Sequence, residues 1–248
     1  MRQSRAMSCE VRIGTSGWHY NHWKGNFYPE KCSPAEMFRI YLEHFDTVEI
    51  NNTFYHLPPH SAFEKWRTIT PPRFLFALKG SRFLTHMKKL SDPVEGIARF
   101  FEGANLLGAK LGPILFQLPP RWKANPERLD SFIEALPKRR RYAFELRDRS
   151  WLVPEIYQVL EGHNAAYCIY DFAGFESPIE ITADFTYVRL HGPSENKYQG
   201  NYSKPQLRRW ADWIGSQRAR LRGVYFYFDN DQAGYAAFNA IDLKAMAA

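Results

Sequence analysis

Apolar and polar residues alternate in a series of short hydrophobic runs, and this alternation constrains the fold more than any other feature of the chain. In residues 47–51, Val48 and Ile50 take one parity. Glu49 and Asn51 take the other. Side chains alternate faces along a strand, so each run has an apolar face and a face that turns polar at its C-terminal end. Such strands fit a parallel barrel whose polar strand ends meet at one mouth.

Strand and helix signals follow one another along the whole chain. Strands are predicted at 11–17, 47–55, 74–80, 112–118, 141–147, 165–171, 185–192 and 223–229. Helices are predicted at 33–44, 61–69, 92–107, 125–136, 153–162, 204–221 and 232–247, several opened by a capping residue or an early proline. Residues 172–184 carry no helical period, so a loop or 3₁₀ turn is expected after the sixth strand. The pattern predicts an α/β fold, a single TIM-type (β/α)8 barrel over residues 11–248 after an N-terminal extension at 1–10.

Length and composition are those of an ordinary globular enzyme-sized domain. The chain has 248 residues, which is the usual length of one such barrel. No apolar run approaches the ~20 residues that span a bilayer, and residues 1–10 lack the apolar segment of a secretory signal. Cys9, Cys32 and Cys168 are odd in number and widely spaced, which indicates neither a disulfide framework nor a metal motif. Cytoplasmic location, no membrane association and a core position for Cys168 are the expectations.

The net charge of +7 raises the question of a nucleic-acid partner. Two basic clusters contribute strongly, Lys138–Arg141 and Arg218–Arg222, and each directly precedes a predicted strand. In a barrel both clusters therefore lie at the bottom face, away from the polar mouth. A solvated basic rim is favoured over a polyanion contact, which stays open as an alternative.

Five sequence blocks resemble a known family. They are Ile13–Trp18, Val48–Tyr55, Phe144–Arg147, Arg189–Gly192 and Tyr227–Asn230. In this order they resemble the YecE-like family, catalogued as domain of unknown function 72, over roughly residues 12–240. The resemblance implies a TIM-barrel fold and implies no particular reaction. Its blocks coincide with the strand ends that the alternation selects independently.

The predicted strand ends supply a set of polar residues for one site. They are Glu49, Asn51, Lys79, Gln117, Glu145, Arg147, Asp171, Arg189, His191 and Asp229. Buried charges must be paired, so a purely structural network of ion pairs is one explanation of this set. The other is an active site, because the strand C-termini of a barrel are where catalytic residues lie.

Roles within such an active site follow from side-chain chemistry. Glu145 and Asp229 are the acid/base candidates, with His191 as a third because its titration lies near neutral pH. Lys79, Arg147 and Arg189 would hold anionic groups of a substrate. The remaining residues with predicted substrate contacts are Glu49, Asn51, Gln117 and Asp171, together with the rim aromatics Trp18 and Tyr55.

Metal and cofactor chemistry has weaker support in the sequence. Several carboxylates and His191 are suitable ligands, but Arg147 and Arg189 would place competing cations among them. No glycine-rich nucleotide motif and no nucleophile elbow is present. We therefore expect neither a metal nor a cofactor.

The sequence favours an enzyme that acts on a small polar substrate, sugar-like or anionic, at the barrel mouth. A hydrolase, a lyase or an isomerase working by acid/base chemistry would suit these residues, and paired carboxylates would also suit glycoside hydrolysis. A nucleic-acid-binding or nucleic-acid-processing protein and a non-catalytic small-molecule binder are the alternatives. The long polar segment 192–203 after the seventh strand is a predicted lid. Nothing in the sequence indicates the oligomeric state.

Overall fold

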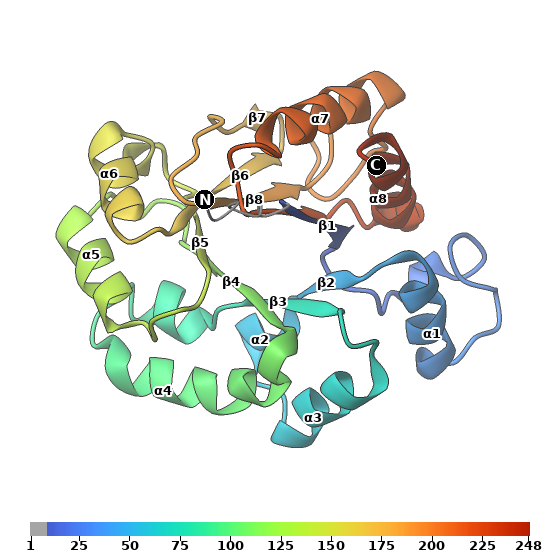
Figure 1. Cartoon of the computed structure of the whole chain (residues 1–248), viewed down its shortest axis with the longest axis horizontal. Coiled ribbons are helices and arrows are strands. Elements are labelled where there is room, and N and C mark those ends of the chain that lie inside the picture. The colour runs from blue at the N-terminus through green and yellow to red at the C-terminus, as the bar shows by residue number, and fades with distance from the viewer. Residues whose placement is uncertain (1–8) are drawn as a thin grey trace, which may run out of the picture.

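Parallel strands form a nearly closed barrel in the computed structural model, which describes residues 9–248 (Figure 1). The strands are β1 (Glu10–Thr15), β2 (Thr47–Ile50), β3 (Leu75–Lys79), β4 (Leu111–Gln117), β5 (Tyr142–Glu145), β6 (Ala166–Phe172), β8 (Phe185–Leu190) and β9 (Gly223–Phe228). Their order in the sheet is β1-β9-β8-β6-β5-β4-β3-β2, and every neighbouring pair is parallel. The predicted TIM-type barrel is confirmed.

The barrel closes between β1 and β2, where the pairing is thinnest. A single parallel bridge joins Ser16 to Glu49, and the Gly17 amide donates to the Glu49 carbonyl at 2.8 Å. Tyr41 completes this seam, because its hydroxyl donates to the Thr47 carbonyl at 2.9 Å and accepts from the Thr15 amide at 3.2 Å. One tyrosine therefore ties both strands of the seam together.

Helices surround the barrel, and most of them have a proline at one of their first two positions. They are α1 (Pro34–His44), α2 (Asn52–Tyr55), α3 (His60–Ile69), α4 (Pro93–Ala104), α5 (Pro126–Ala135), α6 (Pro154–Gly162), α7 (Lys204–Gln217) and α8 (Tyr235–Met246). Short 3₁₀ or π segments are η1 (Asn21–Trp23), η2 (Phe83–Met87), η3 (Asn105–Lys110), η4 (Arg149–Trp151) and η5 (Gln232–Gly234). Ser33 and Ser203 form complete capping boxes. No helix among residues 9–248 is long and apolar enough to cross a membrane.

Three local predictions are wrong. The second strand ends at Ile50 rather than continuing to residue 55, because residues 52–55 turn into the single-turn helix α2. The helix expected at 61–69 begins one residue earlier, at His60 behind Pro59, and no side chain caps it. Asp92 precedes α4 in a left-handed conformation and makes no capping hydrogen bond.

A β-hairpin replaces the helix that would follow the sixth strand. β6 continues to Phe172 and pairs in antiparallel register with the two-residue strand β7 (Phe175–Glu176), so the expected loop or 3₁₀ turn is a hairpin. Gly174, with a φ of +77°, makes the turn that the hairpin requires. At the other end, Glu10 belongs to β1 and not to an extension, and residues 1–8 of the predicted extension lie outside the described residues.

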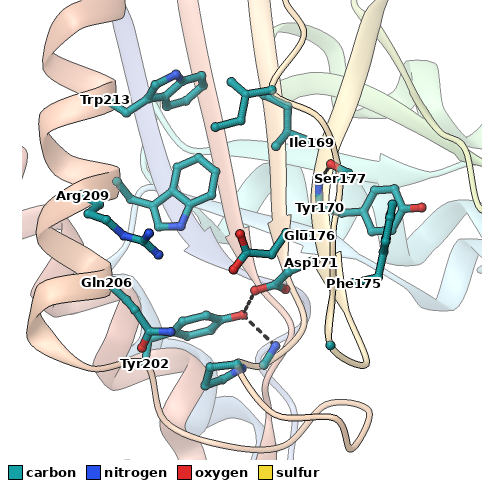
Figure 2. A pocket seen from close by; sticks show the side chains of 15 residues that line it. Ile169, Tyr170, Asp171, Phe175, Glu176, Ser177, Tyr202, Gln206, Arg209 and Trp213 are labelled. Carbon is teal, nitrogen blue, oxygen red and sulfur yellow. Dashed lines mark hydrogen bonds between the residues drawn. The ribbon is translucent and has the colours of Figure 1, made fainter. Parts of the chain in front are cut away.

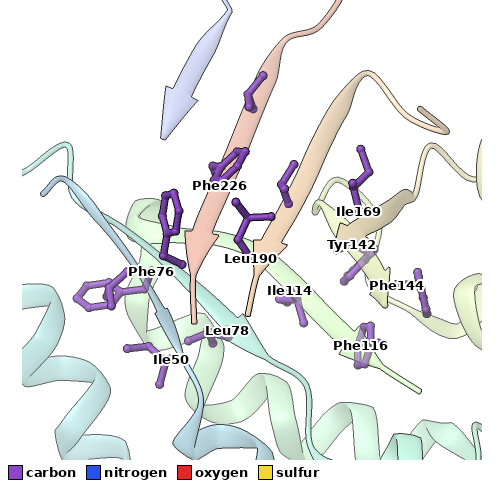
Figure 3. Packing of buried hydrophobic residues seen from close by; sticks show 14 of the residues in the cluster. Ile50, Phe76, Leu78, Ile114, Phe116, Tyr142, Phe144, Ile169, Leu190 and Phe226 are labelled. Atoms are coloured by element: carbon purple, nitrogen blue, oxygen red, sulfur yellow. The ribbon is translucent and has the colours of Figure 1, made fainter. Parts of the chain in front are cut away.

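Two apolar layers hold the barrel. The outer layer packs the strands against the helices, and Figure 3 shows Phe76, Ile114 and Phe226 among its strand side chains. The inner layer fills the barrel with small residues on one side and large aromatic ones on the other. Its members are Ala77, Leu115, Ala143, Ala166, Cys168, Phe185, Tyr187, Tyr225 and Tyr227. Cys168 is thus core, as predicted, and the inward residues further along these strands form the mouth.

A substitution at Gly14 tests whether β1 and β2 approach closely at the seam. A Cβ at this position would lie 2.6 Å from the Thr47 carbonyl oxygen, so Gly14→Ala must push β1 away from β2. We expect a loss of about 1–3 kcal/mol in the free energy of unfolding, measured by urea denaturation. Gly215→Ala is the matched control, because a Cβ there meets nothing within 4 Å and α7 should gain about 0.5–1 kcal/mol. Equal effects at both positions would contradict the close approach at the seam.

Candidate functional site

One buried arginine is the centre of the polar mouth. The Arg189 side chain is 1% exposed and reaches three carboxylates, Glu49 on β2, Glu145 on β5 and Asp229 directly after β9. Its Nη2 donates to Glu49 Oε1 at 2.8 Å and to Asp229 Oδ2 at 2.9 Å, and its Nη1 donates to Glu145 Oε2 at 2.7 Å. The planar guanidinium has enough donors to serve all three at once. Opposite strands of the barrel are therefore joined through one side chain.

Glu145 is held in its ionised form by two arginines. Its Oε1 accepts from Arg147 Nε, and its other oxygen accepts from Arg189. Burial alone would raise the pKa of Glu145, but the positive charges of Arg147 and Arg189 outweigh it and hold that pKa well below the ordinary value. A carboxylate in this environment neither carries nor readily accepts a proton near neutral pH. Its suitable task is to position the arginines.

Asp229 behaves in the opposite way although it belongs to the same network. It is 8% exposed, and burial raises its pKa to about 7 against the lowering effect of Arg189. The negative charges of Glu49 and Asp231 act in the same direction as burial. Arg189 is shared with two other acids, so it compensates Asp229 only in part. Burial therefore brings the pKa of Asp229 toward the physiological range, whereas the pKa of Glu145 is moved away from it.

Lys79 is a second group that titrates near neutral pH. It is 9% exposed, and burial together with the nearby Arg189 charge lowers its pKa to about 8. Its ammonium lies 4.5 Å from the centre of the Phe54 ring. Within residues 9–248 no carboxylate oxygen lies within 4.0 Å of its Nζ. A lysine in such a position is suited to proton transfer or to nucleophilic attack.

The contacts of His191 fix its tautomer. Its Nδ1 lies 2.8 Å from the Asp171 carbonyl oxygen, which only accepts, so this nitrogen carries the proton. Its Nε2 therefore accepts from Arg147 at 3.0 Å and from Arg189 at 2.9 Å. Burial and then the Arg189 charge lower the pKa of His191 well below its ordinary value. The ring is neutral and holds the two arginines in place.

Further polar groups complete the mouth around Glu49. Ser16 Oγ and Tyr187 Oη both donate to the Glu49 carboxylate, the latter at 2.6 Å. Asn51 Nδ2 donates to Ser16 Oγ at 2.7 Å. The Oδ1 atom of Asn51 is buried and has no hydrogen-bond partner among the described residues. It is an acceptor available to a ligand.

A cavity of about 340 Å³ opens beside Arg147 at the mouth. Its polar lining consists of Gln117, Arg147, Arg149 and Lys197, and its aromatic lining of Tyr170, Phe172, Phe175 and Tyr198. The Arg147 guanidinium lies 4.0 Å from the centre of the Phe172 ring. Tyr198, from the segment predicted to be a lid, lies with its ring 5.8 Å from the His191 ring. The cavity volume of about 340 Å³ falls within the usual range for small-molecule pockets, roughly 300–1,000 Å³.

Three predicted site residues lie elsewhere. The inner residues of β6 are Ala166 and Cys168, so Asp171 has the outward parity and faces the space between the β6–β7 hairpin and α7 (Figure 2). Trp18 packs under the helices, with its ring 4.6 Å from that of Phe38. Tyr55 lies on α2, is 60% exposed and contacts the Phe54 ring rather than the charged network.

The charged network already contains a cation at the point where its carboxylates meet. Arg189 occupies the position between Glu49, Glu145 and Asp229. Over residues 9–248, no group of three or more His, Cys, Asp and Glu side chains has an arrangement that would hold a metal ion.

Several site residues escaped the sequence-based prediction. Ser16 has the inward parity at the end of β1, and the alternation rule that selected Glu49 would also have found it. Arg149, Lys197 and Tyr198 lie on loops, where no periodicity indicates which way a side chain points. Phe172 was missed because β6 was expected to end one residue earlier.

Sequence comparisons relate this chain to one family of proteins. A family model described as "Protein of unknown function DUF72" matches residues 12–248. The UPF0759 protein YunF of Bacillus subtilis is 26% identical over 265 residues, covering 92% of this chain and 92% of YunF. The UPF0759 protein YecE of Escherichia coli K12 is 29% identical over 110 residues, covering 43% of this chain and 40% of YecE.

Two solved structures have a similar fold. A DUF72 family protein from Thermotoga maritima superposes with a TM-score of 0.87 at 30% identity, covering 96% of this chain and 98% of that one. A DUF72 family protein from Enterococcus faecalis superposes with a TM-score of 0.82 at 18% identity, covering 96% and 95%. The latter supports the fold alone.

Replacing Arg189 tests whether it holds the mouth together. Arg189→Met leaves three buried carboxylates without their shared cation, so we expect a loss of ~3–5 kcal/mol in the free energy of unfolding at pH 8. Protonation of these acids relieves their repulsion, so the loss should shrink at pH 5. Urea denaturation at both pH values measures it.

Arg39→Met is the matched control for this measurement. Arg39 pairs with Glu43 on the surface of α1, and both side chains are exposed. Such a pair contributes about 0–1 kcal/mol. A loss at Arg189 no larger than at Arg39, or one that is the same at both pH values, would contradict the central role of Arg189.

Proposed function

This chain belongs to the DUF72 family, and we propose that it is an enzyme that acts by acid/base chemistry on a small anionic substrate at the barrel mouth. The family has no reaction in its description, so the proposal rests on the residues of the mouth. The catalytic pair that we propose is Asp229 and Lys79, with Arg147 and Arg189 as the groups that hold substrate and network in place.

The observation that carries the proposal is that two buried charged groups of the mouth lack a full partner: Asp229 shares Arg189 with two other acids, and Lys79 forms no ion pair within 4.0 Å among the described residues. A purely structural network would keep its acids ionised and its lysine paired. Here the pKa of Asp229 is raised to about 7 and that of Lys79 is lowered to about 8, mainly by burial in both cases. Groups tuned to the working pH are what general acid/base catalysis needs.

The roles of the predicted acid/base candidates change accordingly. Asp229 keeps its role. Ionised Asp229 would accept a proton from the substrate, and protonated Lys79 would donate one to the developing negative charge. Glu145 and His191 become positioning residues, because Glu145 is held ionised and His191 neutral by the same two arginines. Proton abstraction from a carbon beside a carbonyl group is the kind of step that this pair supports, with the electron pair moving to the carbonyl oxygen, as in an isomerase or a lyase.

The cavity beside Arg147 supports an anionic, ring-containing substrate. Arg147, Arg149 and Lys197 supply positive charge without a carboxylate in the cavity lining. Arg147 and Arg149 can contact a phosphate or carboxylate through two parallel hydrogen bonds. The aromatic lining offers flat surfaces against which a sugar ring packs. A phosphorylated or carboxylated sugar therefore fits this lining better than a neutral one.

A substrate-panel assay tests the acid/base pair. We expect turnover of a phosphorylated or carboxylated sugar with a bell-shaped pH profile, rising through about 7 and falling through about 8. Asp229→Asn should lower kcat/KM by about 10²–10⁴-fold. Lys79→Met should abolish the fall on the alkaline side, because the group whose deprotonation causes it is gone.

Binding measurements on the same variants distinguish residues that catalyse the reaction from residues that only bind the substrate. Calorimetry should show that glucose 6-phosphate binds more tightly than glucose, and that Arg149→Ser weakens only the phosphorylated ligand. Asp229→Asn should leave this affinity nearly unchanged. Binding without turnover of any member of the panel would favour a non-catalytic binder, and full turnover by Asp229→Asn would refute the proposed pair.

The positions of the two basic clusters distinguish the nucleic-acid alternative from the proposed enzyme. Arg141 pairs with Glu10 at the start of β1, and the Arg222 amide donates to the Asp184 carbonyl just before β8. Both basic clusters thus adjoin strand starts, at the end of the barrel away from the mouth. A six-residue strand is roughly 20 Å long, which exceeds the Debye length of about 8 Å at physiological salt.

Replacing the basic clusters should therefore leave the mouth unaffected. We expect Arg139, Arg140, Arg218 and Arg220, all replaced by Ser, to retain the affinity of glucose 6-phosphate within twofold. A large loss with the fold retained would show that the functional face lies at the bottom. Tight binding of a single-stranded oligonucleotide that falls steeply with salt, and that the same replacements abolish, would favour the nucleic-acid alternative.

A further inference from the structure

A second cavity lies on the outside of the barrel, where the hairpin stands in place of a helix. It has a volume of about 340 Å³ and lies between β6, the β6–β7 hairpin and α7. In a regular (β/α)8 barrel a helix covers this part of the strand layer. The connection between β6 and β8 contains only the short strand β7, so the outer face of β6 beside α7 is left partly uncovered.

The cavity has one apolar wall and one acidic end. Trp210 and Trp213, one helical turn apart on α7, form the wall together with Ile169. Asp171 and Glu176 are directly paired in the hairpin and supply the acidic end (Figure 2). Asp171 accepts through one oxygen from the His191 amide at 2.6 Å and through the other from Tyr202 Oη. Its carboxylate is thereby fixed at the floor of the cavity.

This cavity lies next to the one beside Arg147, because Tyr170 and Phe175 line both, and it also contacts the charged network. The Asp171 carbonyl accepts from His191 Nδ1, and the Asp171 side chain accepts from the His191 amide. Tyr202 also accepts from the Gly192 amide at 2.8 Å, at the start of the segment that lies over the mouth. A ligand held at Asp171 is therefore one residue away from the Arg189 network.

We propose that this cavity is a second ligand site, which takes an organic amine or similar cation that carries an aromatic or branched apolar group. The ammonium would lie between Asp171 and Glu176, and the apolar group would pack on Trp210 and Trp213. Aromatic faces and carboxylates together are the lining that cations of this kind prefer. Arg209 lines the cavity from α7 and opposes the cation, so the lining sets two acids against one base.

The pH dependence of binding should identify Asp171. Burial raises its pKa to about 7, against the hydrogen bonds from Tyr202 and His191 and with the help of the Glu176 charge. Arg209 is the other charged group that lines the cavity. The fraction of Asp171 that is ionised thus rises from about a tenth at pH 6 to about nine tenths at pH 8. Since only the ionised form attracts a cation strongly, amine affinity should rise about tenfold over this interval.

Calorimetry with three matched probes tests the proposal on the whole chain. 2-Phenylethylamine should bind saturably at pH 8, about tenfold more weakly at pH 6, and more tightly than the neutral 2-phenylethanol. Asp171→Asn should weaken the amine at least tenfold and remove the pH dependence. Trp213→Ala should also weaken binding of the amine, and it leaves the hydrogen bonds of Asp171 intact. This variant therefore tests the site even if Asp171→Asn does not fold.

Two control variants make the result specific. Glu180→Gln removes an exposed acid from the same connection outside the cavity, and Lys79→Met alters the mouth at a residue that contacts Phe54 and does not line this cavity. Both should bind the amine as the unaltered protein does, whatever the outcome of the substrate assays. No saturable amine binding, or equal binding by the Glu180→Gln and Asp171→Asn variants, would overturn the site. Tighter binding of 3-phenylpropionate than of the amine would overturn the ligand class and assign the cavity to Arg209.

Discussion

The guanidinium of Arg189 is the interaction on which the rest of the mouth depends. Removing a charge of this kind from water costs several kcal/mol, which only well-placed opposite charges offset. Three strands supply those charges through Glu49, Glu145 and Asp229. The same contacts fix the strand ends relative to one another across the barrel. Structural order and chemical function at the mouth are therefore two consequences of one ion cluster.

The carboxylates of the cluster have unequal numbers of positively charged partners, and this difference gives the cluster its possible chemical use. Glu145 has Arg147 as well as Arg189, whereas Asp229 has only a share of Arg189. Lys79 adds a positive charge to the neighbourhood and forms no ion pair within 4.0 Å in the part of the chain that the structure describes. Fixed, fully paired charges surround two groups that can exchange protons. A network built only for stability has no need of this second class of residue.

Alternation along the strands was sufficient to predict the barrel and most of its polar centre. It placed Glu49, Glu145, Arg189 and Asp229 together because parity is exact within a regular parallel strand. It failed at Asp171, since both faces of β6 are lined by ordinary core residues until the last two positions and the pattern does not reveal the parity. The hairpin after β6 and the helix α2 were missed for a related reason. Two to four residues are too few to show a period. Loop residues at the mouth were unpredictable because their positions depend on tertiary contacts.

The central claim is that the mouth leaves Asp229 free to titrate near neutral pH while it holds Glu145 ionised. The most direct test is a pH titration of the side-chain carboxyl carbons by NMR, with assignment through Asp229→Asn and Glu145→Gln. The account predicts a midpoint of about 7 for Asp229 and no protonation of Glu145 down to the acid limit of the folded state. A midpoint for Asp229 near the ordinary value of about 3.9 would contradict it. In that case the cluster would be a fully paired structural network.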